Sequence, residues 1–294
     1  MWNLERILRS HLILIKVRPK DAFEVPHSEG YQVYSAILSS IQNIDSTVSQ
    51  HIHGTPLHSI SVSGLLGYFS EGRRSGHKRL NPNVSYEIRV GISDPREEEI
   101  YESLILPLFL PDTTISLEQG ALLIEMVEKR SLTFPEMLAG VAKYKRPLLA
   151  FEFLTPTCIQ FRNSKVTEMF PHRVAVFNSL LSKWNQICPE GMRMGIELDD
   201  FGRYLIEKPY PESYSTYSVL VNTVHDVKRD HPRPIFKQGF VCRCDYLVAS
   251  GAHASFKNAV ALLSLFAPFS GVGSSVARGC GHVATTIQEA KNGR

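Results

Sequence analysis

The segment GVGSSVARGCG, residues 271–281, is the part of this sequence that most restricts what the chain can fold into. Its four glycines allow positive φ angles and let a ligand approach the main chain, and its free N–H groups can bind phosphate oxygens. A dinucleotide-binding fingerprint needs a further helix, strand and acidic residue, which the 13 residues after Gly281 (294 − 281) cannot supply. A P-loop is excluded because no Gly-Lys-Ser/Thr follows. The segment is therefore either another kind of phosphate-binding loop or a merely flexible connection.

Length and composition predict a folded protein of about two domains. The 294 residues include 43% hydrophobic and 21% charged residues. The formal net charge is only +3, so a polyanionic partner must be held by local clusters of positive charge. Apolar runs are too short for a signal peptide or a membrane span, and five cysteines without a paired framework suggest a reducing interior. We therefore expect a cytoplasmic protein that does not enter a membrane.

The pair Cys242 and Cys244 is the one close spacing of cysteines in the sequence. Within an apolar stretch, C-x-C is more typical of two strand residues that point to one face than of a metal or redox pair. The chain has neither a CxxC pair nor an HxxxH zinc signature. The sequence therefore predicts no metal and no other cofactor.

The first half of the chain reads strand, helix, strand, strand, helix, strand. A second, shorter helix is expected through Val48 to His53, with Gly54 after it. The helix start at Asp94-Pro95-Arg96-Glu97 combines a capping carboxylate, a first-turn proline and a glutamate three residues after the cap. The other expected elements are a strand at His11–Val17, a helix from Tyr31, hairpin arms at Ser59–Phe69 and Val84–Ile92, and a strand at Ala121–Val127.

The charged segment Lys143–Pro147 is the expected linker to a second unit. In that unit the residue pattern predicts strands at Leu148–Leu154, Met194–Leu198, Tyr217–Val221 and Gln238–Ala249, and helices at Phe170–Ile187 and Ser255–Phe266. Each half fits a split βαβ unit, the layout of an RNA-recognition module. We therefore predict an α+β fold of two tandem ferredoxin-like domains, residues 1–142 and 147–294, with antiparallel sheets and helices on one face.

With this layout, the run FAPFSGVGSSVARGCGHV, preceded by an apolar helix, resembles the glycine-rich signature of the RAMP superfamily. Within it, the chain is similar to the CRISPR repeat-processing endoribonucleases. Supporting pieces occur in the expected order: LILIKVRPKDAFEVP, a histidine after the first helix, ISVSGLLG and FEFLTPTCIQF. The resemblance covers essentially the whole chain. It implies two ferredoxin-like RAMP domains and metal-independent cleavage of precursor CRISPR RNA, which produces guide RNAs for antiviral defence.

The implied reaction is attack of a ribose 2′-OH on the adjacent phosphate, giving 2′,3′-cyclic phosphate and 5′-hydroxyl ends. It needs a base for the 2′-OH proton and an acid for the leaving oxygen, and histidine suits either role. The resemblance places the catalytic histidine in the segment of His51 and His53, and either residue can fill the place. Some family members use a tyrosine of the first helix. Tyr34 is our candidate for it, although an ordinary core tyrosine is the competing interpretation.

Local positive charge and the glycines supply the RNA-binding candidates. The hairpin loop contains Arg73, Arg74, Lys78 and Arg79, which either clamp RNA phosphates or form a solvated tip. Arg278 lies between the loop glycines, where a guanidinium is well placed for a phosphate. The candidate loop glycines are Gly271, Gly273, Gly279 and Gly281.

The expected partner is CRISPR repeat RNA, and the sequence leaves open both homodimer formation and assembly with CRISPR effector subunits. A non-catalytic RAMP subunit that holds guide RNA is the main alternative, because the glycine-rich segment and the basic hairpin serve binding equally well. A small-molecule ferredoxin-like enzyme is the other alternative. The histidine pair favours a nuclease over the first, and the lack of a convergent carboxylate or metal cluster in the sequence disfavours the second.

Overall fold

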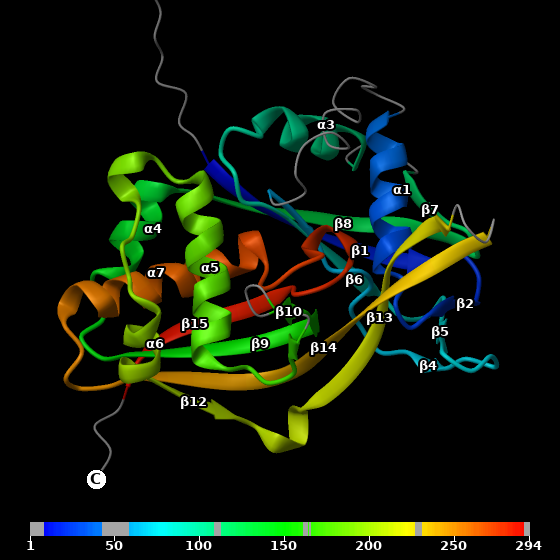
Figure 1. Cartoon of the computed structure of the whole chain (residues 1–294). Helices are drawn as coiled ribbons and strands as arrows, with labels where there is room; N and C mark the ends of the chain where they lie inside the picture. The colour runs from blue at the N-terminus through cyan, green and yellow to red at the C-terminus, as the bar shows by residue number, and fades with distance from the viewer. Residues whose placement is uncertain are drawn as a thin grey trace, which may run out of the picture.

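Two antiparallel five-stranded sheets, one from each half of the chain, form the framework of the protein (Figure 1). They are seen in a computed structural model that describes residues 9–42, 59–108, 113–160, 164, 166–226 and 231–290. The helix α7 (Ala254–Ser270) packs against strands of both sheets. Within the described ranges, no helix combines the length and the apolar character that crossing a membrane requires.

The first sheet forms around β1 (Arg9–Pro19), where the alternate side chains of Ile13, Ile15 and Val17 are fully buried. The helices α1 (Gly30–Gln42) and α3 (Glu98–Leu108) share this core with the strands. In the order in which they lie side by side, its strands are β3 (Ile60–Val62), β6 (Tyr86–Ile92), β1 (Arg9–Pro19), β8 (Gly120–Thr133) and β7 (Thr114–Leu117).

The hairpin predicted over residues 59–92 is only partly correct. β3 does pair with β6, but β3 is three residues long, far shorter than the predicted arm. The chain after it forms a separate small sheet in the order β2-β5-β4. Its strands are β2 (Phe23–Pro26), β4 (Ser70–Glu71) and β5 (His77–Leu80). The basic loop is thus itself a hairpin, β4–β5, that is anchored on β2.

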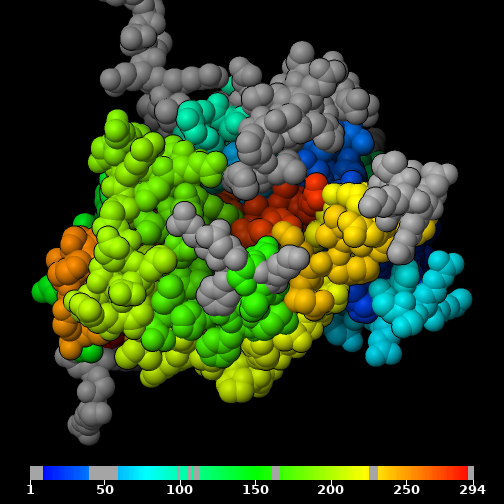
Figure 2. Space-filling view, viewed as in Figure 1, coloured from blue at the N-terminus to red at the C-terminus, as the bar shows by residue number. Residues whose placement is uncertain are grey.

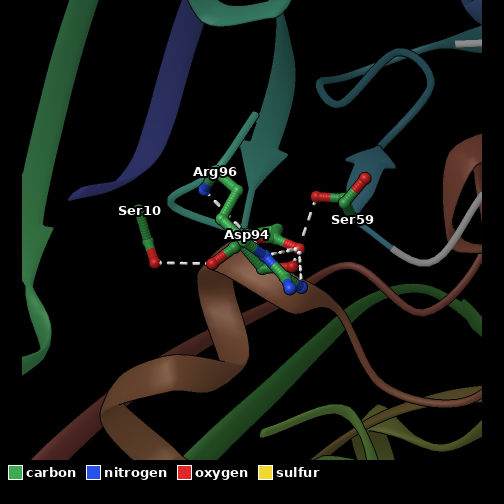
Figure 3. A network of polar contacts seen from close by, with 5 residues as sticks. Ser10, Ser59, Asp94 and Arg96 are labelled. Carbon is green, nitrogen blue, oxygen red and sulfur yellow. Dashed lines mark hydrogen bonds and ion pairs between the residues drawn. The ribbon is translucent and has the colours of Figure 1, made fainter. Parts of the chain in front are cut away.

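The predicted helix start at Asp94 is wrong by nearly one turn, because α3 begins at Glu98. Asp94 forms a turn instead: its Oδ1 accepts the backbone N–H of Arg96 at 2.9 Å, and its Oδ2 lies 2.6 Å from Nη2 of the same arginine. Figure 3 shows this pair between Ser10 and Ser59. Ser10 Oγ donates to the Ser93 carbonyl at 2.7 Å, and Ser93 Oγ donates to the Ser59 carbonyl at 3.2 Å. The polar group therefore joins the ends of three strands rather than capping a helix.

The second sheet is built on β9 (Pro147–Thr157), in which every other side chain is buried. Cys242 and Cys244 lie buried on β14 (His231–Val248), opposite Phe153 and Phe151, so the interpretation of C-x-C as two strand residues on one face is confirmed. In order, the strands are β12 (Leu205–Pro209), β14 (His231–Val248), β9 (Pro147–Thr157) and β15 (Val283–Glu289), with β13 (Ser215–Asp226) paired to β14.

The helices α5 (Arg173–Ile187), α6 (Leu198–Tyr204) and α7 contribute to the core of this second sheet. The predicted strand at Met194–Leu198 is wrong. Met194 is held by the Asn185 side chain, which accepts its N–H at 2.9 Å and donates to its carbonyl at 2.8 Å, so this segment follows α5 as a loop. The remaining short elements are β10 (Ile159–Gln160), β11 (Thr167–Glu168) and the 3₁₀ turns η1 (Glu190–Met192), η2 (Pro211–Ser213) and η3 (Val276–Arg278).

Each sheet places the first and third strands of a βαββαβ unit at its centre, β1 and β6 in one and β9 and β14 in the other. This is the ferredoxin-like order, so the predicted fold class is confirmed. The domain boundary near residues 142–147 stays a prediction. The helix α4 (Phe134–Val141) precedes that boundary, yet Phe134 and Met137 pack in the second core.

Candidate functional site

A cavity of about 430 Å³ opens where the two halves of the chain meet. Its walls include the start of α1, the segment that follows β3, and the strand β13. Residues 271–281, which we call the glycine-rich loop, also line it. Leu65 and Phe69 supply apolar surface, and Glu29, Lys78 and Arg278 supply charge. Figure 2 shows the red C-terminal part of the chain recessed between green and yellow surfaces. The fold therefore brings the glycine-rich loop to a hollow between the two units.

The glycine-rich loop is fixed from behind by two side chains of α5. Ser179 Oγ accepts the Gly273 N–H at 2.8 Å, and Lys183 Nζ donates to the carbonyls of Ser270 and Gly271 at 3.0 and 2.9 Å. Ser179 and Lys183 are four positions apart in the sequence, which places their side chains on one face of the helix. Burial lowers the pKa of Lys183 to about 7. The loop is thus held in place and is not merely a flexible connection.

The front of the loop touches the first half of the chain at Gly279. A Cβ on Gly279 would lie 2.6 Å from the Gly30 Cα, and its φ is +87°. Both the close approach and the left-handed backbone require glycine. The loop residue therefore docks directly on the first residue of α1. The other three predicted glycines, Gly271, Gly273 and Gly281, also have positive φ.

Arg278 extends from the loop to the cavity and to α1. Its Nη1 donates to the Val221 carbonyl at 2.9 Å, and its Cζ lies 5.6 Å from the centre of the Tyr31 ring. Its buried Nε has no hydrogen-bond partner among the residues that the structure describes. Because an unpaired guanidinium N–H is costly to bury, this donor favours an anionic ligand.

Tyr34 lies one turn further along α1, in the apolar core of the first half. Burial raises the pKa of its hydroxyl, and the positive charge of Arg278 partly opposes that rise. His51 and His53 lie outside the described residues, as does the short helix expected around them. The structure therefore does not place the two predicted catalytic histidines, and their role stays a prediction.

The basic side chains of the hairpin differ in exposure: some face solvent and others pack against the fold. Arg73 and Arg74 are exposed at its turn, where their backbone N–H groups donate to the Glu24 carboxylate at 2.9 and 3.4 Å. The Arg73 N–H is the main cause of the lowered pKa of Glu24. Lys78 instead points inward, and its Nζ lies 2.9 Å from Glu29 Oε1 and 3.9 Å from the centre of the Phe69 ring.

Arg79, the fourth predicted charge, stands opposite Glu24 in the register of β5 and β2 and is half-buried. Of the four predicted phosphate ligands, Arg73 and Arg74 are therefore exposed at the hairpin turn. Lys78 and Arg79 are partly buried beside Glu29 and Glu24.

Sequence reasoning missed Lys183, Ser179 and Glu29. A lysine within the apolar run LLSKW of α5 was the available signal, because a buried lysine needs acceptors. His282 was missed as well. It follows the loop, is fully buried, and burial lowers its pKa to about 3. Among the described residues, no group of three His, Cys, Asp or Glu side chains is arranged to hold a metal ion.

The sequence of residues 151–283, which includes the whole glycine-rich loop, matches the model of the family described as CRISPR-associated endoribonuclease Cas6. The resemblance to CRISPR repeat-processing endoribonucleases is confirmed. The family match likewise supports endoribonuclease activity for this chain. No curated protein matches its sequence.

Solved structures share the fold of this chain along nearly its full length. A Cas6 product complex is 15% identical with a TM-score of 0.64, covering 95% of this chain and 100% of that one. A Cas6-related protein from Pyrococcus furiosus is 13% identical with a TM-score of 0.62, covering 94% and 98%. Cas6 from Thermus thermophilus is 14% identical with a TM-score of 0.61, also covering 94% and 98%. The chain therefore shares its fold with solved structures of Cas6 proteins.

Proposed function

We propose that this Cas6-type chain cleaves precursor CRISPR RNA within its repeats, without a metal ion, and so produces mature guide RNAs. A ribose 2′-OH attacks the adjacent phosphorus, and the bond from phosphorus to the 5′-oxygen breaks. The 2′-OH proton passes to a base, and an acid protonates the 5′-oxygen. The products are a 2′,3′-cyclic phosphate and a 5′-hydroxyl, so no water is consumed in this step.

The observation that carries this proposal is the fixed glycine-rich loop, with Arg278 beside the cavity. Arg278 offers a buried Nε donor that has no partner among the described residues, whereas most main-chain N–H groups of the loop already donate within the fold. An unpaired guanidinium donor beside a cavity suits a phosphate of the RNA backbone. Two proteins of similar fold are described as a Cas6 product complex and a RAMP protein binding different RNA substrates.

His51 and His53 are the proposed acid and base, because histidine exchanges protons near neutral pH and proton transfer of this kind accelerates cleavage. Tyr34 is the proposed third group. Its position on α1, close enough to Arg278 for the two to interact, supports a role near the bound phosphate. Arg73 and Arg74, together with Lys78 and Arg79 in β5, would add charge along the path of the RNA.

Cleavage of a panel of CRISPR repeat RNAs, with and without a hairpin, in EDTA tests the proposal. We expect wild type to cut in EDTA, and the double variant His51→Ala/His53→Ala to lose about 10²-fold or more in rate while still binding. An RNA with 2′-deoxyribose at the cleavage site should bind and stay intact. Arg278→Ala should weaken binding and reduce its salt dependence by about one phosphate contact.

Each alternative gives a different result in the same assay. Binding without cutting by wild type would indicate a non-catalytic RAMP subunit that holds guide RNA. Cleavage that survives both histidine changes would remove His51 and His53 from the active site, and cleavage of the 2′-deoxy RNA would exclude 2′-OH attack. Analytical ultracentrifugation of the same samples checks homodimer formation.

A further inference from the structure

The five cysteines of the chain are all buried and free, but they differ in their surroundings. Burial raises the pKa values of Cys242 and Cys244 to about 12, so both are inert thiols inside the second core. Cys158 and Cys280 lie together in a separate small cluster, whose other members are Val219 and Val221. This cluster is distinct from both large cores.

The main chain brings Cys158 and Cys280 together where the end of β9 meets the glycine-rich loop. Ser274 donates to the Cys158 carbonyl from its N–H at 2.8 Å and from its Oγ at 3.0 Å. On the other side of the loop, the Gly281 N–H donates to the Pro156 carbonyl at 2.9 Å. Cys158 and Cys280 pack in the same small cluster, and each thiol shifts the pKa of the other.

The surroundings of this pair favour a reactive thiolate at Cys158. The hydrogen bond from Cys280 lowers the pKa of Cys158, and the positive charge of Lys237 acts in the same direction. Lys237 is fixed there because its Nζ donates to Ser274 Oγ at 2.9 Å. The same hydrogen bond, together with burial, raises the pKa of Cys280. The pair thus combines a thiolate-forming sulfur with a protonated neighbour, which is the arrangement of an attacking and a resolving cysteine.

The cavity gives this pair a route to solvent. Cys280 lines the cavity together with Gly279 and Arg278. A small oxidant that enters the cavity therefore meets the cluster from the loop side. Cys242 and Cys244 do not line this cavity.

We infer that Cys158 and Cys280 are a site of oxidative modification, where a peroxide joins them in a disulfide that displaces the glycine-rich loop and weakens RNA binding. The Cys158 thiolate attacks the peroxide, its S–O bond forms as the O–O bond breaks, and hydrogen peroxide leaves one water. The Cys280 thiol then displaces the sulfenic hydroxyl as a second water. The two thiols lose two electrons and two protons in total, and a thiol reductant reverses the change.

The bond would move the loop because the sulfurs of two cysteines that are packed side by side must approach to about 2.05 Å. The backbone around the two cysteines is too closely packed to absorb that shift. A Cβ on Gly273 would already lie 2.5 Å from the carbonyl oxygen of Cys158, so the loop backbone touches the residue that follows β9. Arg278 and Gly279 directly precede Cys280, and the displacement passes to them. The consequence for RNA rests on the proposed function, whereas formation of the disulfide does not.

The test oxidises the full chain with hydrogen peroxide and counts free thiols, maps linked peptides by mass spectrometry, and measures affinity for a repeat RNA before and after dithiothreitol. We expect the thiol count to fall from five to three, a 158–280 linked peptide, and RNA affinity at least about tenfold lower until reduction restores it. Cys242→Ser is the matched control, a buried thiol away from the cavity, and should keep the whole response. Cys158→Ser and Cys280→Ala should each abolish the linked peptide.

Three results would overturn the inference: no disulfide under peroxide, a disulfide between other cysteines, or a 158–280 disulfide with unchanged RNA affinity in a wild type that binds RNA. If wild type never binds RNA, the proposed function fails, but the thiol count and linked peptide still decide whether the oxidation site exists. Because two variants remove the pair separately, a folding defect in one does not prevent the test.

Discussion

The glycine-rich loop and the basic β4–β5 hairpin both approach the cavity between the two halves, but the fold holds them in different ways. The loop is fixed on several sides, by Ser179 and Lys183 of α5, by the end of β9 and by Gly30. The hairpin is anchored by the pair of Lys78 and Glu29 and by the backbone bonds from its turn to Glu24, while the side chains of Arg73 and Arg74 at the turn are exposed. The loop therefore depends on the exact position of its backbone, and the hairpin turn contributes mainly charge.

Glycine replacements at matched positive φ angles give the largest expected difference between the two regions. Gly279→Ala places a Cβ 2.6 Å from the Gly30 Cα at φ +87°, whereas Gly76→Ala in the hairpin turn, at φ +73°, meets nothing within 4 Å. Both variants carry a backbone cost of about 1–2 kcal/mol, and only Gly279→Ala adds overpacking of roughly 1–3 kcal/mol. Chemical unfolding measures the difference. Equal losses of stability in the two variants would mean that the loop is not docked on α1.

The second-largest effect on stability is expected at Lys183, whose pKa of about 7 in the fold lies below the 10.5 of an ordinary lysine. Between these values the unfolded chain binds more protons than the folded chain, so the contribution of Lys183 makes the free energy of unfolding rise with pH from about 7 to about 10. Lys183→Met should remove this slope and weaken RNA binding by releasing the Ser270 and Gly271 carbonyls.

Urea unfolding at several pH values between 6 and 9 checks this, with Lys16→Met, an exposed lysine of β1, as the control. If the wild-type slope persisted in Lys183→Met, another group would be responsible for it.

The smallest effect on stability is expected at the hairpin turn. The double variant Arg73→Ala/Arg74→Ala removes two exposed guanidinium groups while the backbone bonds to Glu24 remain, so the free energy of unfolding should change by less than about 0.5 kcal/mol. RNA affinity should fall with a salt slope reduced by about two, one for each phosphate contact. Fluorescence anisotropy from 50 to 300 mM salt measures the slope. An unchanged slope would show that the hairpin turn does not touch RNA.

The sequence was a good guide where local patterns determine structure. Alternating apolar residues located β1, β9 and β14, and the clustered glycines of residues 271–281 marked a loop with positive φ angles. The sequence was a poor guide where a contact between two distant segments determines the environment of a side chain. Glu29 and Lys78 are 49 positions apart, so their pairing has no local signal, and Lys78 looked as free as Arg73.

The capping pattern at Asp94 failed for a related reason. Its carboxylate is taken by Arg96, two residues away, and the surrounding serines tie this turn to β1 and β3. A helix-start pattern cannot show that competition. The catalytic histidines were predicted by family resemblance and not by a local pattern, and they lie outside the described residues, so only the cleavage assay tests them.

The helix α7 links the geometry of the two halves to the chemistry of the loop. Ser61 Oγ of the first half donates to its Phe269 carbonyl at 3.2 Å, and a Cβ on Gly91 would lie 2.2 Å from the same oxygen. One residue later, at Ser270, the helix ends and the loop begins. A chimera that exchanges one half between related proteins must therefore preserve the contact of α7 with β3 and β6, whereas substitutions at the exposed hairpin turn should cost the fold least.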